Sequence, residues 1–210
     1  MKHIRSGSAV FDIGASYGVH TLLMARLVGA HGRVYAFEPV PEILAALCGN
    51  VRLNRFENVT CVEQAAGDSV GHAEFVLGRD TSTGHVAGTP EVDGPAITVR
   101  ITTLDEFVFV RDARPPDFIK IDVEGFAGRV LCGADRVLES FRPILLIDLH
   151  EPAEDRAVGR ILLERGYEVF RTDDGRRVTK LTRPRPDAEG IWGQVLALPK
   201  GLDATQDAGS

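Results

Sequence analysis

The opening of the chain places an apolar run, a glycine turn and a helical pattern in an order that few folds can accommodate. The run Ala9–Gly14 (AVFDIG) has the length of a buried strand and ends in glycine. Apolar residues at helical spacing follow it, namely Val19, Leu22, Leu23 and Leu27. A strand over Arg33–Phe37 and a helix opened by Pro41 repeat the alternation. The N-terminal part is therefore predicted to be a βαβα unit of a parallel sheet.

The rest of the chain continues this alternation. Further strands are predicted over 59–63, 73–77, 97–101, 117–123 and 143–149, helices over 129–141 and 153–165, and a closing strand pair over 167–172 and 191–199. Residues 78–95, rich in Gly, Thr, Ser, Asp and Pro, are expected to form a mobile lid or a binding loop. The pattern predicts one doubly wound α/β domain over residues 1–200 and a flexible C-terminal tail over 201–210. In such a sheet the ligand binds at the carboxyl ends of the strands.

Charge and hydropathy exclude several classes of partner. The 24 Lys and Arg residues against 30 Asp and Glu give a net charge of −6, the wrong sign for a domain held mainly by nucleic-acid phosphates. No apolar run approaches the roughly 20 residues that span a bilayer, and the N-terminus lacks the apolar stretch of a signal peptide. We therefore expect a cytoplasmic protein with no nucleic-acid and no membrane partner, and the sequence leaves a homo-oligomer open.

The glycine turn also restricts the cofactor. Gly14 and Gly18 let the backbone turn tightly and approach a ligand, and the helix that follows presents its unpaired N–H groups. A dinucleotide fingerprint would need glycine where Asp12 stands. A carboxylate there repels a diphosphate by about 1 to 4 kcal/mol at a separation of about 4 Å, and it attracts a cation. S-adenosylmethionine carries an ammonium and a sulfonium but no phosphate, so Asp12 favours this cofactor.

The end of the second strand supplies a further cofactor residue. Glu38 lies 24 residues after Gly14, where its carboxylate can accept both ribose hydroxyls. NAD would use the same feature, so an NAD(P)-dependent reductase is an alternative function, which Asp12 disfavours. A cofactor-binding domain without catalysis is the other alternative.

Titratable residues lie at the ends of two of the predicted central strands, and four of them are expected to converge. Asp122 and Glu124 are two positions apart, as are Asp148 and His150, so each pair points to one side where extended geometry persists. His150 is the first candidate for a general base, because its reference pKa of about 6.5 suits proton transfer near neutrality, and His85 is the second. A structural histidine bonded to a backbone carbonyl is the alternative for His150. The carboxylates could also bind Mg²⁺, but their competing cofactor roles argue against a metal site.

Several longer motifs occur together, namely VFDIGASYG (Val10–Gly18), AFEP, TLDEF (Thr103–Phe107), FIKIDVEGF (Phe118–Phe126), VLCGA and RPILLID. Together they resemble the FkbM family of S-adenosylmethionine-dependent methyltransferases, over about residues 10–150. The resemblance implies a Rossmann-like class I methyltransferase fold, with a mostly parallel seven-stranded sheet whose last strand is antiparallel. It also implies an O-methyltransferase that acts on a hydroxyl of a small natural product, such as a macrolide, or of a sugar.

The resemblance also assigns roles to individual residues. The cofactor turn would comprise Asp12, Gly14, Ser16, Tyr17 and Gly18. Glu38 would hold the ribose, Ala66 and Asp68 would border the adenine, and Asp122 would lie beside the methionine part or the methyl group. Together with the strand-end pattern, this gives the predicted catalytic residues His150, Asp122, Glu124 and His85.

The chain departs from the family pattern at three places. Ser16 stands where the family commonly has asparagine, and Ala127 stands where a second acidic residue often follows EGF. Only nine residues precede Val10, whereas many members have a substantial segment there. Ser16 can still form hydrogen bonds, so the first departure affects cofactor binding little. The short segment before Val10 is expected to leave part of the usual cover of the substrate pocket absent.

Overall fold

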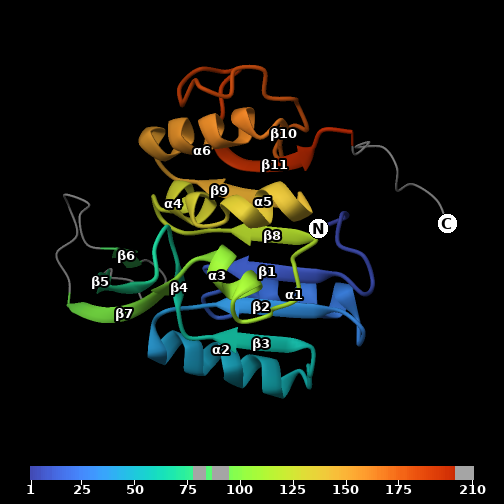
Figure 1. Cartoon of the computed structure of the whole chain (residues 1–210), viewed down its shortest axis with the longest axis vertical. Helices are drawn as coiled ribbons and strands as arrows, with labels where there is room; N and C mark the ends of the chain where they lie inside the picture. The colour runs from blue at the N-terminus through green and yellow to red at the C-terminus, as the bar shows by residue number, and fades with distance from the viewer. Residues whose placement is uncertain (78–83, 87–94, 202–210) are drawn as a thin grey trace.

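The computed structural model describes residues 1–77, 84–86 and 95–201, with only the backbone of residues 77 and 84–86. Its centre is a seven-stranded sheet (Figure 1). In spatial order the strands are β10 (Tyr167–Arg171), β11 (Gly193–Pro199), β9 (Ile144–Leu149), β8 (Phe118–Ile121), β1 (Ala9–Ile13), β2 (Arg33–Phe37) and β3 (Val59–Val62). Only β11 pairs antiparallel, with β9 and β10. The predicted mostly parallel sheet with an antiparallel last strand is confirmed.

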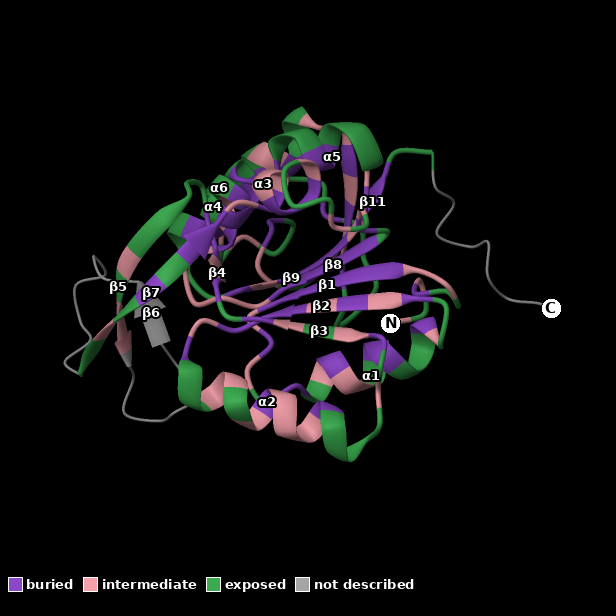
Figure 2. Ribbon diagram, turned by 60° about the horizontal axis from the view of Figure 1, so that its bottom comes forward, coloured by how far each residue is buried: buried purple, intermediate pink, exposed green. Residues whose placement is uncertain are grey.

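Helices cover both faces of this sheet (Figure 2). One face carries α1 (Val19–Val28) and α2 (Pro41–Leu53), and the other carries α3 (Leu104–Phe109), α4 (Ala127–Cys132), α5 (Asp135–Phe141) and α6 (Pro152–Glu164). Every residue of β1 and β8 is buried, as expected for parallel strands covered on both faces. The largest core cluster includes Phe11, Phe37 and Phe107, whose ring centroids lie 4.9 to 5.9 Å apart. No helix in the described ranges is long and apolar enough to cross a membrane.

A second, smaller sheet projects beside the carboxyl ends of the main strands (Figure 1). It contains β4 (Ala65–Ala66), β7 (Ala96–Thr102), β5 (Gly71–Leu77) and β6 (Gly84–Val86), in this spatial order. The strands predicted over 73–77 and 97–101 therefore exist, but they belong to this sheet. The prediction of a loop over 78–95 is wrong for 84–86, which pair with β5 as a strand. The other residues of that loop, 78–83 and 87–94, and the predicted tail from 202 onward lie outside the described residues.

Two other predicted elements differ from the structure. The single helix expected over 129–141 is two helices, α4 and α5, which are separated at Gly133. A Cβ on Gly133 would overlap the carbonyl oxygen of Gly67, so the chain turns where it crosses another segment. The strand expected over 117–123 ends at Ile121, and Asp122 and Val123 lie beyond it.

The apolar pattern that predicted α1 does not mark its buried face. The helix forms where expected, but its buried residues are Thr21, Met24, Ala25 and Val28. In contrast, Val19 is 76% exposed, Leu23 44% and Leu27 36%. Met24, Ala25 and Val28 pack into a core cluster with Ile4 and Val10, so the N-terminal segment and β1 fix the orientation of the helix. Of the four apolar residues that predicted the helix, Leu22 packs partly buried against a core cluster, and Val19, Leu23 and Leu27 lie on the outer face.

Two glycines inside helices should respond to alanine in opposite directions. A Cβ on Gly159 in α6 would overlap the carbonyl oxygen of Leu181, whereas one on Gly49 in α2 would meet no atom within 4 Å. We expect Gly159→Ala to lower the free energy of unfolding by about 1 to 3 kcal/mol or more, because the backbone must shift. Gly49→Ala should raise it by about 0.5 to 1 kcal/mol. Urea unfolding of both variants measures the difference, and equal destabilisation would contradict the close packing of residue 181 on α6.

Candidate active site

The predicted site lies where β1 and β8 end. Ile13 pairs with Ile121 at the last register position, so Gly14 and Asp122 leave the sheet side by side. Gly14 has a φ of 79°, and a Cβ there would overlap the carbonyl oxygen of Asp122, so glycine is required on both grounds. Tyr17, later in the same turn, is 38% exposed. The strand order reverses between β1 and β8, which is the crevice where doubly wound sheets bind ligands.

Glu38 holds the glycine turn from the neighbouring strand. It directly follows β2 and is only 5% exposed. Its Oε2 accepts a hydrogen bond from the backbone N–H of Ser16 at 3.0 Å, and its Oε1 accepts one from Val40 at 2.9 Å. Burial raises the pKa of this carboxyl, and the two backbone N–H groups oppose that rise. Because each carboxylate oxygen can accept two hydrogen bonds, both oxygens keep capacity for a ligand.

A buried ion pair lies beneath the turn. Asp12 is fully buried, its Oδ2 accepts the hydroxyl of Thr21 at 2.6 Å, and its Oδ1 lies 3.5 Å from Nζ of Lys120. Lys120 is itself 1% exposed, and its Nζ also lies 3.2 Å from Oδ2 of Asp122. Asp12 and Lys120 are register partners in β1 and β8. The protein thus supplies a cation to Asp12, which weakens the electrostatic basis on which the sequence predicted a cationic cofactor.

Sequence reasoning missed Lys120. The signal that could have found it is a lysine inside the otherwise apolar strand β8, since lysine is almost never fully buried unless it is paired. A buried lysine implies a buried acid, and Asp12 is the one that the neighbouring strand provides.

His150 lies between two carboxylates. Its Nε2 is 3.3 Å from Oδ1 of Asp122, and its Nδ1 is 3.3 Å from Oε2 of Glu124. The hydrogen bond to Asp122, with help from the charge of Glu124, raises the pKa of His150 to about 8 against the opposing effect of burial. The same bond lowers the pKa of Asp122 to about 2. The imidazole is therefore mainly protonated at pH 7.

Asp148, the fourth group predicted to converge here, has a different direct partner. Its two carboxylate oxygens accept the side-chain amide of Gln194 at 3.0 and 3.2 Å. Burial and the nearby charge of Asp122 raise its pKa, so it lies within electrostatic reach of the other three groups. The structure brings Asp122, Glu124 and His150 into contact, although the two acids lie beyond the end of β8 and not on it.

Glu154 is a second residue that sequence reasoning missed. It is 3% exposed, and its Oε2 accepts the backbone N–H of His150 at 2.8 Å while its Oε1 accepts that of Ala127 at 2.9 Å. It thereby joins the segment after β9 to the first turn of α4. An acidic residue in the first turn of a helix opened by Pro152 is the signal that could have identified it as a helix-capping group.

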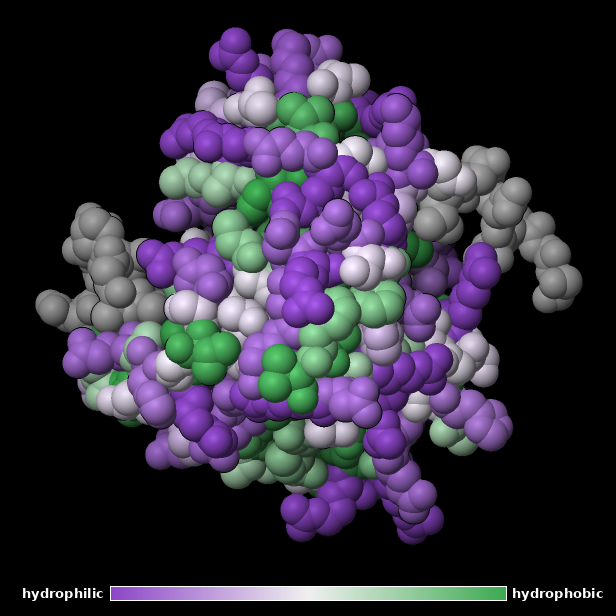
Figure 3. Space-filling view, viewed as in Figure 1, coloured by the Kyte–Doolittle hydropathy of each residue, from purple (hydrophilic) through white to green (hydrophobic). Residues whose placement is uncertain are grey.

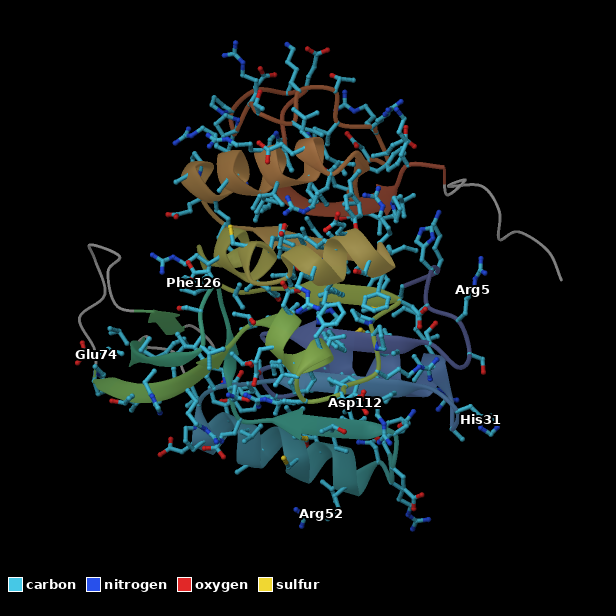
Figure 4. The ribbon with its side chains drawn as sticks, in the orientation of Figure 1. Arg5, His31, Arg52, Glu74, Asp112 and Phe126 are labelled. Atoms are coloured by element: carbon cyan, nitrogen blue, oxygen red, sulfur yellow. The ribbon has the colours of Figure 1, made fainter. Side chains whose placement is uncertain are left out.

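The remaining predicted cofactor residues are Gly18, Ala66 and Asp68. Gly18 is the N-cap of α1 with a φ of 90°, and Ala66, at the end of β4, is buried. A carboxylate oxygen of Asp68 lies 3.7 Å from the guanidinium of Arg129, and both side chains are partly exposed. That guanidinium lies 5.1 Å from the ring centroid of Phe126, which Figure 4 shows on the side that carries the small sheet.

The geometry supports neither the predicted role of His85 as a base nor a metal site among the described residues. The backbone of His85 belongs to β6, where it pairs with Val76, but its side chain lies outside the described residues. Within residues 1–77, 84–86 and 95–201, no group of three His, Cys, Asp or Glu side chains is arranged to hold a metal ion. The role of His85 as a second base stays a prediction.

Removing the charge of Lys120 should destabilise the fold. Lys120→Met keeps the apolar stem, but it leaves the carboxylate of Asp12 buried without its counter-charge. We expect the free energy of unfolding to fall by about 3 to 5 kcal/mol, measured by urea unfolding followed by circular dichroism. Adding Asp12→Asn to this variant should restore most of the loss. The matched control is Lys180→Met at the exposed pair with Glu189, which should leave the unfolding transition nearly unchanged. If Lys120→Met unfolds at the wild-type urea concentration, the pair does not stabilise the fold.

Comparison with known sequences identifies the family. The family model described as Methyltransferase FkbM domain matches residues 12–169. Hexuronic acid methyltransferase AglP of Haloferax volcanii is 24% identical over 193 residues, which cover 87% of this chain and 70% of that protein. The 31-O-demethyl-FK506 methyltransferase FkbM of Streptomyces tacrolimicus is 25% identical over 160 residues, which cover 63% and 61%. The chain spans between 21% and 70% of the length of the curated relatives that it matches.

Comparison with solved structures agrees with the family match in the fold that it shows. The crystal structure of methyltransferase FkbM from Methylobacillus flagellatus KT matches with a TM-score of 0.60 at 21% identity, over 91% of this chain and 43% of that chain. At this identity the likeness shows the fold, which is that of the class I methyltransferases. The family match includes the glycine turn, the ion pair of Asp12 with Lys120, and His150 with its carboxylates. The chain belongs to the FkbM family of S-adenosylmethionine-dependent methyltransferases.

Proposed function

We propose that the protein is an O-methyltransferase that transfers the methyl group of S-adenosylmethionine to a hydroxyl of a small natural product or a sugar. The observation that carries this proposal is His150, held between Asp122 and Glu124 beside the glycine turn. A hydroxyl acceptor has a high pKa, so it needs a base at this place. A hexuronic acid methyltransferase and a 31-O-demethyl-FK506 methyltransferase among the relatives support the two acceptor classes.

The residues at the strand ends suit the cofactor. The Oδ1 of Asp12 is buried and accepts no hydrogen bond within the described part of the chain, so it keeps capacity for a donor beyond Lys120. Glu38 would hold the ribose, Ala66 and Asp68 would border the adenine, and Asp122 would lie beside the methionine part. When bound, S-adenosylmethionine supplies a methyl group on a positively charged sulfur, which an oxygen nucleophile takes by in-line displacement.

His150 takes the hydroxyl proton in this proposal. A neutral imidazole carries one N–H, which one of the flanking carboxylates accepts, and the substrate hydroxyl takes the place of the other carboxylate at the second nitrogen. Asp122 stays ionised at neutral pH, so it orients the ring and stabilises the imidazolium that forms. Glu154 fixes the backbone at His150. Alignment of the hydroxyl oxygen with the methyl carbon can lower the barrier by about 7 to 11 kcal/mol.

The alternatives differ in what they bind and convert. The family match favours methyl transfer over the hydride transfer of an NAD(P)-dependent reductase. A cofactor-binding domain without catalysis would bind S-adenosylmethionine but convert no acceptor. The cytoplasmic location, the absence of a nucleic-acid partner and a possible homo-oligomer stay predictions.

Cofactor binding tests the turn and Glu38 together. We expect calorimetry to show micromolar binding of S-adenosylmethionine or its demethylated product, and no binding of NAD(H). Glu38→Ala should weaken that affinity by about tenfold or more, because a charge-assisted hydrogen bond contributes about 1.5 to 3 kcal/mol. The control Glu42→Ala, at an exposed position of α2, should leave the affinity unchanged. Binding of NAD(H) alone would contradict the proposed function.

The pH dependence tests His150. Because the base must be neutral, kcat/KM should rise with pH and level off above about 8, the pKa of His150. His150→Gln should lower turnover about 10²- to 10⁴-fold in a panel of hydroxylated acceptors, with cofactor affinity nearly unchanged. The control His72→Gln, at an exposed position of β5, should keep both the turnover and the pH profile. Wild-type turnover in His150→Gln would assign the proton transfer to another group.

A further inference from the structure

The outer face of α1 carries an apolar stripe. Val19, Leu23 and Leu27 are spaced four residues apart, which places them in one row along the helix. They are 76%, 44% and 36% exposed. Single exposed aliphatic residues are common, but a helix that is apolar on its outer face as well as its inner face is typical of one covered on both sides. We name these three residues the α1 stripe.

Basic side chains flank the stripe. Arg26 is the basic residue of the last turn of α1, and the helix contains no acidic residue. The N-terminal segment lies against the same end of the helix, because the N–H of Gly7 donates to the carbonyl of Val28 at 2.7 Å. This contact places the exposed Lys2 and Arg5 beside α1.

The other flank of α1 is also basic. The side-chain amide of Asn58 donates to the carbonyls of Ala25 at 2.8 Å and Gly29 at 2.9 Å, so the segment after α2 lies against the end of α1. That segment carries the exposed Arg55, and the exposed Arg52 lies in the last turn of α2 just before it. We name Lys2, Arg5, Arg26, Arg52 and Arg55 the basic rim. In Figure 4, Arg5 extends from the surface near the N-terminal segment, and Arg52 extends from the surface below α2.

The N-terminal part of the chain carries a different net charge from the rest. Residues 1–60 contain six Lys and Arg and four acids, of which Asp12 and Glu38 are buried and Glu42 and Glu57 are exposed. The other residues contain 18 Lys and Arg against 26 Asp and Glu, although residues 176–185 form a second basic stretch. The surface of the first two βα units is therefore net positive in a protein whose remainder is net negative. The opposite face, in front of α3 and α5, is a mosaic of hydrophilic and hydrophobic residues (Figure 3).

We propose that the α1 stripe and the basic rim dock this protein on the surface of an anionic lipid bilayer. A helix that lies in the bilayer interface buries an apolar row at the acyl boundary and places cations among the headgroups. Each Lys or Arg near an anionic surface adds to the attraction, and the acidic remainder of the protein is repelled, which orients the molecule. This docking departs from the sequence expectation of no membrane partner, and it does not depend on the proposed function.

Other occupants fit the face less well. A second copy would pair this face with itself about a two-fold axis, which brings the basic rims of both copies close together. A nucleic acid would match the cations but leave the three aliphatic side chains against its charged backbone. A bilayer matches both features at once.

Vesicle flotation tests the docking. At low salt, the wild-type protein should float with vesicles of phosphatidylcholine and phosphatidylglycerol but not with vesicles of phosphatidylcholine alone. Binding should fall steeply with added salt, because the Debye length shortens from about 10 Å at 0.1 M to about 3 Å at 1 M. Leu23→Ser/Leu27→Ser and, separately, Arg26→Gln/Arg55→Gln should each weaken the partition by about tenfold or more.

The matched control removes exposed aliphatic residues from the other face. Val110 and Leu163 are 72% and 54% exposed, and Val110→Ser/Leu163→Ser should float like the wild type. Circular dichroism and cofactor calorimetry verify that every variant is folded. The proposal is overturned if the wild-type protein stays out of the vesicle fraction, or if the stripe variant floats like the wild type. Sedimentation that shows a dimer lost in the stripe variant, with no flotation, would assign the face to a second copy.

Discussion

The buried pair of Asp12 and Lys120 is the interaction on which the geometry of the site depends. A carboxylate removed from water is costly unless it is paired and hydrogen-bonded, and this one has Lys120 on one oxygen and Thr21 on the other. Because the two residues are register partners, the pair joins the two strands whose ends form the turn. Lys120 also contacts Asp122, which contacts His150, so a continuous chain of charges runs from beneath the cofactor turn to the candidate base.

Much of the fold follows from local patterns in the sequence. Buried parallel strands are short apolar runs, and most of them begin and end within two residues of the expected limits. The errors arise where distant segments meet. The break at Gly133 depends on the carbonyl of Gly67, and the orientation of α1 depends on Ile4 and Val10. No window of neighbouring residues contains these contacts.

The site was predictable in its acids and histidine but not in its buried partners. Asp122, Glu124 and His150 follow strands that end at one edge, so the rule for parallel sheets brings them together. Lys120 and Glu154 have partners that become visible only when strands and helices are assembled. The charge argument from Asp12 was incomplete for the same reason, because it placed a carboxylate beside a ligand without the lysine beneath it.

The small sheet is formed by one continuous stretch of chain between β3 and α3, and its described residues share no ladder with the seven-stranded sheet. Insertions and deletions in that stretch can therefore accumulate during evolution without breaking a strand pairing of the central scaffold. Its base nevertheless lies at the strand ends, since Gly67 adjoins Phe126. A change of length in the small sheet would thus alter the surroundings of the strand ends and leave the pairing of the central strands intact.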